Sequence, residues 1–465
     1  MAAPHVLVLP FPAQGHVIPL MELSHCLVEH GVKVTFVNTE LNHGLVLGAL
    51  DTRVTNLGGV DMVSVPDGLG GGDDRKNLGR LTESFSKVMP GELEKLVGRI
   101  NAAAGPDRIG WMIADVNMAW AFTVAKRLGL RAAGFCPSAA AMFATRIRIP
   151  ELIRDGVLDE GGWPRRRGTF RLAPAMPPMD AAEISWNRAG DPGGQPAIFQ
   201  LILRNNAATH LAEAIVCNSV EELEPGAFAL FPGVLPVGPL SAAAGDDGKP
   251  VGSFWPEDAS CAAWLDAQPA GSVVYVAFGS FAAFGAAQLA ELAEGLALAS
   301  RPFLWVLRPD AARGDDGRLL DRLRRRAAEC GGRAVSWCPQ RRVLASPAVA
   351  CFVTHCGWNS TMEAAANGVP LLCWPYFADQ FLNQSYVCDV WRTGLKMPAA
   401  AEAGEAGGVV GREVVKEKVE ELLGDAETKA RALALRGVVR GAVADGGSSR
   451  RNLGRFVDLV RGSAR

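Results

Sequence analysis

Residues 337–380 read WCPQRRVLASPAVACFVTHCGWNSTMEAAANGVPLLCWPYFADQ, and the rest of the chain is best interpreted from this stretch. A strand-like apolar run ends at His355 and is followed by a tight CGWNS turn. A helix-compatible run at 361–367 comes next, and a second apolar run ends in Asp379 and Gln380. Parallel α/β sheets bind anions and polyols where strand ends meet a helix N-terminus. The stretch therefore predicts a ligand site at the edge of a sheet.

Composition limits the class of protein. The chain has 465 residues, which predicts two domains of about 200 residues each. Apolar residues make up 49% and charged residues 21%, as in a globular protein, and the net charge of −2 does not indicate nucleic acid or an anionic membrane as a partner. We see neither a bilayer-spanning apolar run nor a secretory leader, and we expect a cytoplasmic monomer. Ten cysteines without paired spacing predict reduced thiols.

Strand-like and helix-like segments alternate along the chain. An apolar run at 5–12 leads into an amphipathic helix at 13–31 and then a second apolar run at 33–39. This order predicts an α/β fold with a parallel sheet and right-handed crossovers. A similar alternation begins with the apolar run at 272–280. We therefore expect two Rossmann-like domains, each with a parallel sheet.

A stretch rich in Pro, Gly, Ala and Asp separates the two alternations and has the composition of a linker. The Gly-rich segment 68–77 is predicted to be a surface loop, and 150–195 is predicted to be irregular. The expected organisation is an N-terminal domain at 1–240, a linker at 241–256, a C-terminal domain at 257–445, and a final helix at 446–465 that packs back on the N-terminal domain.

His16 and Asp115 both follow expected strands of the first domain. A histidine can take a proton from a hydroxyl group at neutral pH, and a carboxylate on its other nitrogen can fix the tautomer and stabilise the imidazolium. Sequence alone leaves a purely structural histidine as an alternative.

The HCGWNS turn predicts a diphosphate site. Gly357 permits the tight turn, and backbone N–H groups at the following helix start can hold phosphate oxygens. His355 can donate to the same phosphate, and the Ser280 hydroxyl follows a neighbouring strand. A plain strand–helix turn around a buried Trp358 remains the alternative.

Other polar and aromatic residues of 337–380 fit a nucleoside sugar. Trp337 could stack on a base and Gln340 could bind its edge. Glu363 could accept hydrogen bonds from ribose hydroxyls, although an exposed helical glutamate is the alternative. Asp379 and Gln380 could bind sugar hydroxyls.

Common nucleotide and hydrolase motifs are absent from the sequence. We find no GxGxxG after a strand, no GxxxxGK[ST], no GxSxG and no HExxH. An Asp-x-Asp pair that could hold a metal against a diphosphate is also absent, so we predict no metal site. The positive charge for a leaving diphosphate is then expected from His355 and helix dipoles.

The stretch 337–380 resembles the signature box of plant family 1 UDP-dependent glycosyltransferases. The matching motifs are WCPQ, HCGWNS, Glu363, GVP, WP and DQ, and elsewhere FPAQGH, Asp115, VGPL, FGS and GGSS. Ser346 and Ala350 stand where the family usually has His and Gly. The resemblance spans the whole chain and implies the GT-B fold, in which two Rossmann-like domains face each other across a cleft.

The resemblance also implies residue roles. His16 would be the general base and Asp115 its partner. The acceptor pocket would lie in the first domain, near Trp120, Phe135, Met142, Phe143 and residues 150–195. The residues expected to bind the UDP-sugar are Ser280, Trp337, Cys338, Gln340, His355, Trp358, Asn359, Ser360, Glu363, Asp379 and Gln380.

The expected reaction is transfer of glucose from UDP-glucose to a hydroxyl group of a small lipophilic acceptor, with inversion at the anomeric carbon. Gln380 resembles the residue of glucose-preferring members. UDP-glucose would be a co-substrate, and no cofactor is expected. A flavonoid or phenylpropanoid is the expected acceptor, with a hormone-like acid or a terpenoid as alternatives. A nucleotide-sugar epimerase or hydrolase, or a UDP-sugar-binding protein without transferase activity, would be the rival functions.

Overall fold

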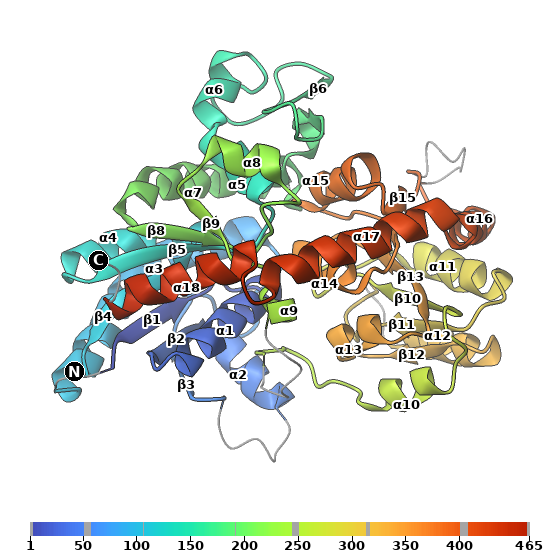
Figure 1. Ribbon diagram of the computed structural model, residues 1–465, viewed down its shortest axis with the longest axis horizontal. Coiled ribbons are helices and arrows are strands. Elements are labelled where there is room, and N and C mark those ends of the chain that lie inside the picture. The colour runs from blue at the N-terminus through green and yellow to red at the C-terminus, as the bar shows by residue number, and fades with distance from the viewer. Residues whose placement is uncertain are drawn as a thin grey trace. The chain divides into compact units, whose positions relative to one another are not determined.

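The chain forms two compact units in a computed structural model (Figure 1). Unit 1 comprises Met1–Phe254 and Arg440–Arg465, and unit 2 comprises Trp255–Val439. The predicted linker at 241–256 contains this division, and its residues 244–250 lie outside the described part of the chain. The structure describes residues 3–50, 57–105, 107–190, 192–243, 251–312, 317–399 and 408–462.

Unit 1 is built on a parallel sheet of seven strands in the order β3-β2-β1-β4-β5-β8-β9. The central strands are buried along nearly their whole length, because helices cover both faces of such sheets. The strands are β1 (His5–Leu9), β2 (Lys33–Thr39), β3 (Val60–Val65), β4 (Ile109–Asp115), β5 (Arg131–Cys136), β8 (Ala214–Cys217) and β9 (Val234–Pro236).

Helices of unit 1 present apolar stripes to this sheet. In α3 (Leu78–Ala103), for example, Leu81, Phe85, Met89 and Leu93 recur every four residues and are all buried. The sequence predicted α1, α3, α4 and α7, but it did not predict α2 or α5. The remaining helices are α1 (Gln14–Glu29), α2 (Glu40–Ala49), α4 (Trp120–Arg127), α5 (Ala140–Ile147), α6 (Ile149–Arg154), α7 (Gln195–Ala208), α8 (Pro225–Leu230), α9 (Leu240–Ala243) and the 3₁₀ turns η1 (Val116–Met118) and η5 (Thr209–Leu211).

The segment predicted as irregular, 150–195, contains short ordered elements. An antiparallel pair, β6 (Thr169–Phe170) and β7 (Met179–Asp180), lies within it. Trp186 is almost fully buried against Phe199 of α7, which fixes this segment to the rest of unit 1. Three 3₁₀ turns follow the strand pair, at η2 (Ala181–Glu183), η3 (Ser185–Arg188) and η4 (Pro192–Gly194).

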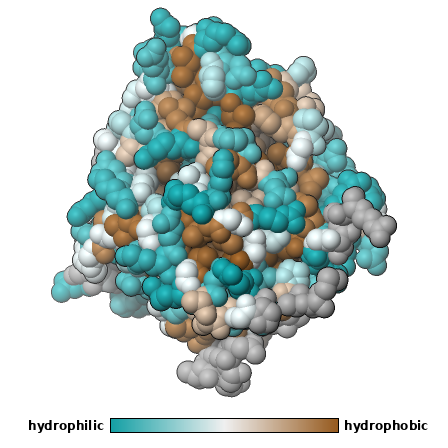
Figure 2. All heavy atoms as spheres, turned by 90° about the vertical axis from the view of Figure 1, so that its left-hand side faces the viewer, coloured by the Kyte–Doolittle hydropathy of each residue, from teal (hydrophilic) through white to brown (hydrophobic). Residues whose placement is uncertain are grey.

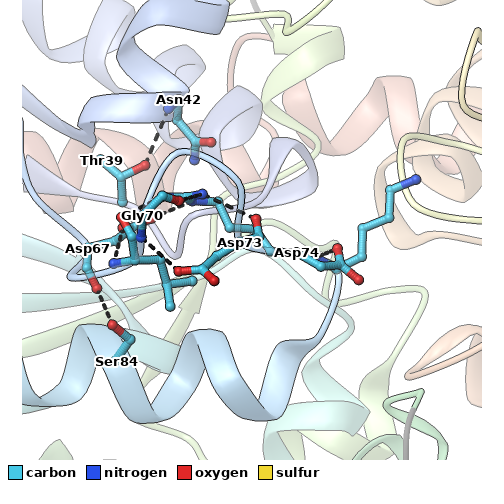
Figure 3. Close-up of polar contacts among 10 residues, drawn as sticks. Thr39, Asn42, Asp67, Gly70, Asp73, Asp74 and Ser84 are labelled. Carbon is cyan, nitrogen blue, oxygen red and sulfur yellow. Dashed lines mark hydrogen bonds and ion pairs between the residues drawn. The ribbon is translucent and has the colours of Figure 1, made fainter.

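The Gly-rich segment 68–77 is a surface loop, as predicted, and polar contacts hold it in place (Figure 3). Asp67 is buried at its start and accepts hydrogen bonds from Arg75 at 2.8 and 3.1 Å. The Ser84 hydroxyl donates to the Asp67 carbonyl at 2.9 Å, and the Gly70 N–H donates to Asp73 at 2.8 Å. The loop is therefore stabilised by the ion pair between Asp67 and Arg75 and by its own backbone hydrogen bonds.

Unit 2 contains a six-stranded parallel sheet in the order β12-β11-β10-β13-β14-β15. The sheet places β10 and β14 on either side of β13, the strand predicted from CFVTH. The strands are β10 (Val273–Ala277), β11 (Phe303–Val306), β12 (Arg333–Val335), β13 (Val349–Thr354), β14 (Leu371–Cys373) and β15 (Gly394–Lys396).

The helices of unit 2 include the one predicted after the HCGWNS turn. The sequence placed this helix at 361–367, whereas α14 begins three residues earlier, at Trp358. Asn359 and Ser360 therefore lie in its first turn. The helices are α10 (Ser260–Asp266), α11 (Ala286–Leu298), α12 (Arg318–Glu329), α13 (Gln340–Ala345), α14 (Trp358–Asn367), α15 (Gln380–Ser385), the π-helical turn η6 (Tyr386–Val390), α16 (Arg412–Gly424) and α17 (Ala426–Val443), which crosses the boundary of the units at Val439.

The C-terminal helix α18 (Ser448–Arg461) belongs to unit 1. Its buried residues Leu453, Phe456, Val457 and Val460 join the core that β1, β2 and α1 form. The Asn452 side chain also donates to the Pro236 carbonyl of β9 at 3.0 Å.

The surface is mixed in polarity. On the face shown in Figure 2, apolar side chains lie in patches among polar ones, as on most soluble domains. All ten cysteines are free, and eight of them are buried, in agreement with the prediction of reduced thiols. Of the helices that the structure describes, none combines the length and the apolar character that crossing a membrane requires.

Candidate active site

His16 lies in the first turn of α1, directly after β1 and its Pro-rich loop. Its imidazole packs against the Phe11 ring, with the ring centroids 5.0 Å apart. The side chain retains 26% of its accessible surface, so a substrate can still reach it.

Asp115 is the last residue of β4, and β4 pairs with β1 in parallel. The carboxyl ends of the two strands therefore meet at one edge of the sheet. The Asp115 carboxylate is fully buried, and its Oδ2 lies 2.6 Å from His16 Nδ1. Because Nδ1 is occupied, Nε2 is the His16 nitrogen that remains for proton transfer. Two side chains 99 positions apart thus form a dyad.

In unit 2, three neighbouring strand ends bring the predicted donor residues to one edge. Ser280 follows β10, His355 follows β13, and Asp379 follows the loop after β14. Gly357 is the N-cap residue of α14 and offers no side chain to cap the helix, whose N-terminus points its dipole at this edge. Non-glycine residues with positive φ, Cys356 and Ala378, mark the tight turns of this edge.

Two glycines enclose the His355 ring. A Cβ atom added to Gly279, which also has φ +66°, or to Gly357 would collide with His355 Nε2. Burial and the nearby Arg308 charge lower the pKa of His355 to about 4, although a hydrogen bond with the Ala277 backbone opposes this shift. The imidazole is therefore neutral near pH 7. The expectation that His355 supplies positive charge was wrong, because the sequence could not indicate how deeply the ring is buried.

Three predicted donor residues meet at the start of α13 and α14. The Gln340 amide donates to Ser360 Oγ at 2.9 Å and to Glu363 Oε2 at 2.8 Å. Its carbonyl oxygen accepts from the Tyr275 hydroxyl at 3.0 Å. Glu363 is buried, which raises its pKa. Glu363 is therefore not the exposed helical glutamate that sequence reasoning allowed.

Aromatic and thiol groups lie beside this cluster. Trp337 is half-buried, and its ring lies 5.0 Å from that of Trp255 at an interplanar angle of 31°. Cys338 is buried, which raises the pKa of its thiol, and its Sγ lies 3.3 Å from the Tyr275 hydroxyl. Trp358 is buried, and its ring centroid lies 6.2 Å from that of Trp391.

The acid–amide pair after β14 is well ordered by hydrogen bonds. Gln380 Oε1 accepts from the N–H groups of Tyr376 and Phe377 at 2.8 and 3.0 Å. Asp379 Oδ2 accepts from the Asn383 side chain at 3.0 Å. The residues predicted to bind the sugar therefore also form hydrogen bonds within the loop that leads to α15.

Comparison with known proteins gives a consistent result. Residues 251–402 match the family model described as "UDP-glucoronosyl and UDP-glucosyl transferase". UDP-glycosyltransferase 83A1 of Arabidopsis thaliana is 42% identical over 99% of this chain and 97% of its own length. The chain belongs to the plant UDP-glycosyltransferase family.

Two further relatives carry names that describe their ligands. A 7-deoxyloganetic acid glucosyltransferase of Catharanthus roseus is 32% identical, over 99% of this chain and 98% of its own length. Phytolacca americana UGT2, solved with UDP-2-fluoro-glucose and pterostilbene, has a TM-score of 0.77 and 26% identity, with 99% of both chains covered. The UDP-glycosyltransferase is thus a GT-B protein with two parallel sheets, and its reaction is glucosyl transfer from a UDP-sugar.

The acceptor residues predicted for the UDP-glycosyltransferase do not form one exposed set. Phe135 is fully buried and belongs to the core that β1, β4 and α1 share, because β5 is an inner strand. Its assignment to an acceptor pocket is therefore corrected. Met142 and Phe143 are buried on α5, with Phe143 packed against Phe231, whereas Trp120 is half-buried at the start of α4.

Sequence reasoning missed three polar residues beside the predicted groups: Asn117, Arg146 and Arg308. Arg308 lies two residues beyond β11 and donates to the Gly279 and Ala282 carbonyls at 2.8 and 2.5 Å. Arginine in the otherwise apolar run 302–309 was the available signal. Among the residues that the structure describes, no group of three or more His, Cys, Asp or Glu side chains is placed to hold a metal ion.

Proposed function

We propose that the enzyme transfers glucose from UDP-glucose to a hydroxyl group of a small lipophilic acceptor, with inversion at the anomeric carbon. The contact between His16 Nδ1 and Asp115 Oδ2 at 2.6 Å carries this proposal. His16 Nε2 takes the acceptor proton as the acceptor oxygen attacks the anomeric carbon. The bond to UDP breaks in the same step, and Asp115 stabilises the imidazolium that forms.

Unit 2 supplies the donor site in this proposal. Trp337 offers an aromatic face for uracil, and the Gln340–Glu363 pair offers acceptors for ribose hydroxyl groups. Ser280, Asn359, Ser360 and neutral His355 act as hydrogen-bonding groups for the diphosphate, together with the N–H groups at the start of α14. Cys338 lines the base side and Trp358 the sugar side, and Asp379 and Gln380 bind the sugar hydroxyls.

Negative charge builds on UDP as it leaves, and Arg308 is our candidate for the balancing cation. Arg308 is 2% exposed, lies beneath the turn that carries Ser280, and lowers the pKa of His355 through its charge. A fixed positive charge in a water-poor site stabilises a developing anion without reorganisation. This assignment replaces the role first expected of a charged His355.

The acceptor class rests on weaker support than the donor. A phenolic acceptor, such as a flavonoid or a phenylpropanoid, fits the pterostilbene complex of the Phytolacca protein. The name of the Catharanthus relative favours an acid as the alternative. A mass-spectrometric screen of UDP-glucose with a plant metabolite extract would separate these classes. Glucosylated products restricted to acids would overturn the phenolic proposal.

The His16→Ala variant tests the mechanism. Transfer should fall by about 10²–10⁴-fold, because general-base assistance is worth this much, while UDP binding should stay at the wild-type level. Initial rates by product chromatography and UDP titration by calorimetry measure the two effects. His30→Ala is a matched control, since His30 lies at the other end of α1, and it should keep wild-type activity. Wild-type turnover in His16→Ala would overturn the mechanism.

A further inference from the structure

Arg146 is a buried cation without a directly paired carboxylate. It lies on α5 with 4% of its surface exposed, and it forms no ion pair within 4.0 Å with any residue in the described part of the chain. Its Nε has no hydrogen-bond partner there. Burial lowers the pKa of Arg146, and the charges of Cys136 and, to a smaller extent, Asp115 oppose this effect. Burying a guanidinium without a paired carboxylate lowers the stability of the fold, which indicates that Arg146 has a role other than stabilisation.

Hydrogen bonds connect Arg146 to the dyad through Asn117. Arg146 Nη1 donates to Asn117 Oδ1 at 2.7 Å. A guanidinium can only donate hydrogen bonds, so it pairs with the carbonyl oxygen of the Asn117 side-chain amide and not with its amino group. The Asn117 amino group must then point the other way, and it donates to Asp115 Oδ1 at 2.9 Å. Arg146 thus determines the orientation of the Asn117 side-chain amide.

The orientation of Asn117 determines what Asp115 offers to His16. Asp115 Oδ1 accepts from both the side chain and the backbone N–H of Asn117, the latter at 2.7 Å. Its Oδ2 accepts from His16 Nδ1. The Nδ1 proton of His16 is therefore held on the carboxylate, and the lone pair stays on Nε2, where the acceptor hydroxyl must be deprotonated.

Helix α7 fixes both members of this chain. The Asn205 side chain donates to the Asn117 carbonyl at 2.7 Å, and the Asn206 side chain donates to the Arg146 carbonyl at 2.7 Å. These hydrogen bonds hold the backbone from which the Asn117 and Arg146 side chains project, and catalytic geometry depends on such restraint.

We propose that Arg146 and Asn117 are positioning residues that keep the Asp115 carboxylate oriented for proton transfer at His16. The inference rests on the proposed function, because it assigns to His16 the role of base.

Arg146→Met and Asn117→Ala test the inference, with initial rates measured in the wild-type and Asp115→Asn backgrounds. We expect kcat to fall about tenfold or more in the wild-type background, with the KM for UDP-glucose within about twofold of its normal value. In the Asp115→Asn background the same changes should lower kcat by less than about twofold, because their effect passes through the carboxylate. Arg146→Lys keeps a donor-only cation and should recover part of the loss.

Arg148→Met is the matched control, since Arg148 follows α5 and pairs with Glu151 at the surface. It should leave kcat unchanged. Equal losses in both backgrounds would indicate a structural role and overturn the inference, as would wild-type kcat in both variants. Asn117→Ala decides the matter if Arg146→Met does not fold. Wild-type turnover in His16→Ala or Asp115→Asn would instead overturn the proposed function itself.

Discussion

The His355 imidazole is enclosed by the backbones of Gly279 and Gly357, and this enclosure sets its charge. Burial of the ring favours its neutral form, and the nearby Arg308 cation acts in the same direction. His355 can therefore donate or accept a hydrogen bond near pH 7, but it does not act as a cation there. The close approach of the His355 ring therefore explains glycine at 279 in the FGS motif and at 357 in the HCG motif as much as turn geometry does.

This burial predicts a pH dependence of stability. The pKa of His355 is about 4 in the folded protein, below its ordinary value of 6.5, so the unfolded chain binds the additional proton between these values. Its contribution to stability is present above about pH 6.5 and is lost as the pH falls towards 4. Urea unfolding should give about 2 kcal/mol less stability from this residue at about pH 5 than at about pH 7. The His355→Gln variant should lack this part of the pH slope, and identical slopes in both proteins would contradict the prediction.

At the scale of elements, the ends of β10 and β11 form one structural unit. Arg308, after β11, donates to two carbonyls of the turn that follows β10 and carries Ser280. It also lies 5.6 Å from the centroid of the Trp255 ring, which packs against Trp337 in a tilted arrangement. One buried side chain thus contacts both the diphosphate end and the base end of the proposed donor site.

Arg308→Met should distinguish the charge of this residue from its packing. UDP should bind about tenfold more weakly because its phosphates lose a buried positive charge, whereas uridine should bind within about twofold of the wild-type affinity. Calorimetric titration of both ligands measures the difference. Arg326→Met, which removes a surface arginine paired with Glu294, should change neither affinity. Equal weakening of UDP and uridine would mean that Arg308 only supports the turn.

At the scale of the whole molecule, unit 1 depends on residues from both ends of the chain. Phe456 of α18 is fully buried in the core formed by β1, β2 and α1, more than four hundred positions earlier in the sequence. The end of the chain therefore takes part in the stability of the unit that holds His16 and Asp115.

Phe456→Ala should destabilise unit 1 by about 3–5 kcal/mol, because it removes a large buried ring and leaves a cavity. Urea unfolding followed by tryptophan fluorescence would measure this change. Asp458→Ala, on the exposed side of the same helix, should change stability by less than about 0.5 kcal/mol. The prediction would fail if the two variants unfolded at the same urea concentration.

Local patterns predicted much of the fold. The run 33–39 was predicted as a strand and is β2, Lys33–Thr39, and the helix predicted at 286–300 is α11, Ala286–Leu298. Periodicity failed for α5, where Met142, Phe143 and Arg146 are all buried and no polar face interrupts the pattern. It also placed the start of α14 too late, because Trp358, Asn359 and Ser360 resemble turn residues when they are read without their surroundings.

The sequence by itself determined the parallel α/β class, the family and the residue types at the strand ends, because each depends on local pattern and spacing. Only the tertiary structure decided that Asp115 lies 2.6 Å from His16, that Phe135 belongs to the core, and that His355 is neutral. The hydrogen bonds that connect Arg146, Asn117 and Asp115 were likewise visible only in the tertiary structure. Distances, burial and charge depend on side chains that come together from distant parts of the chain, and no local pattern records them.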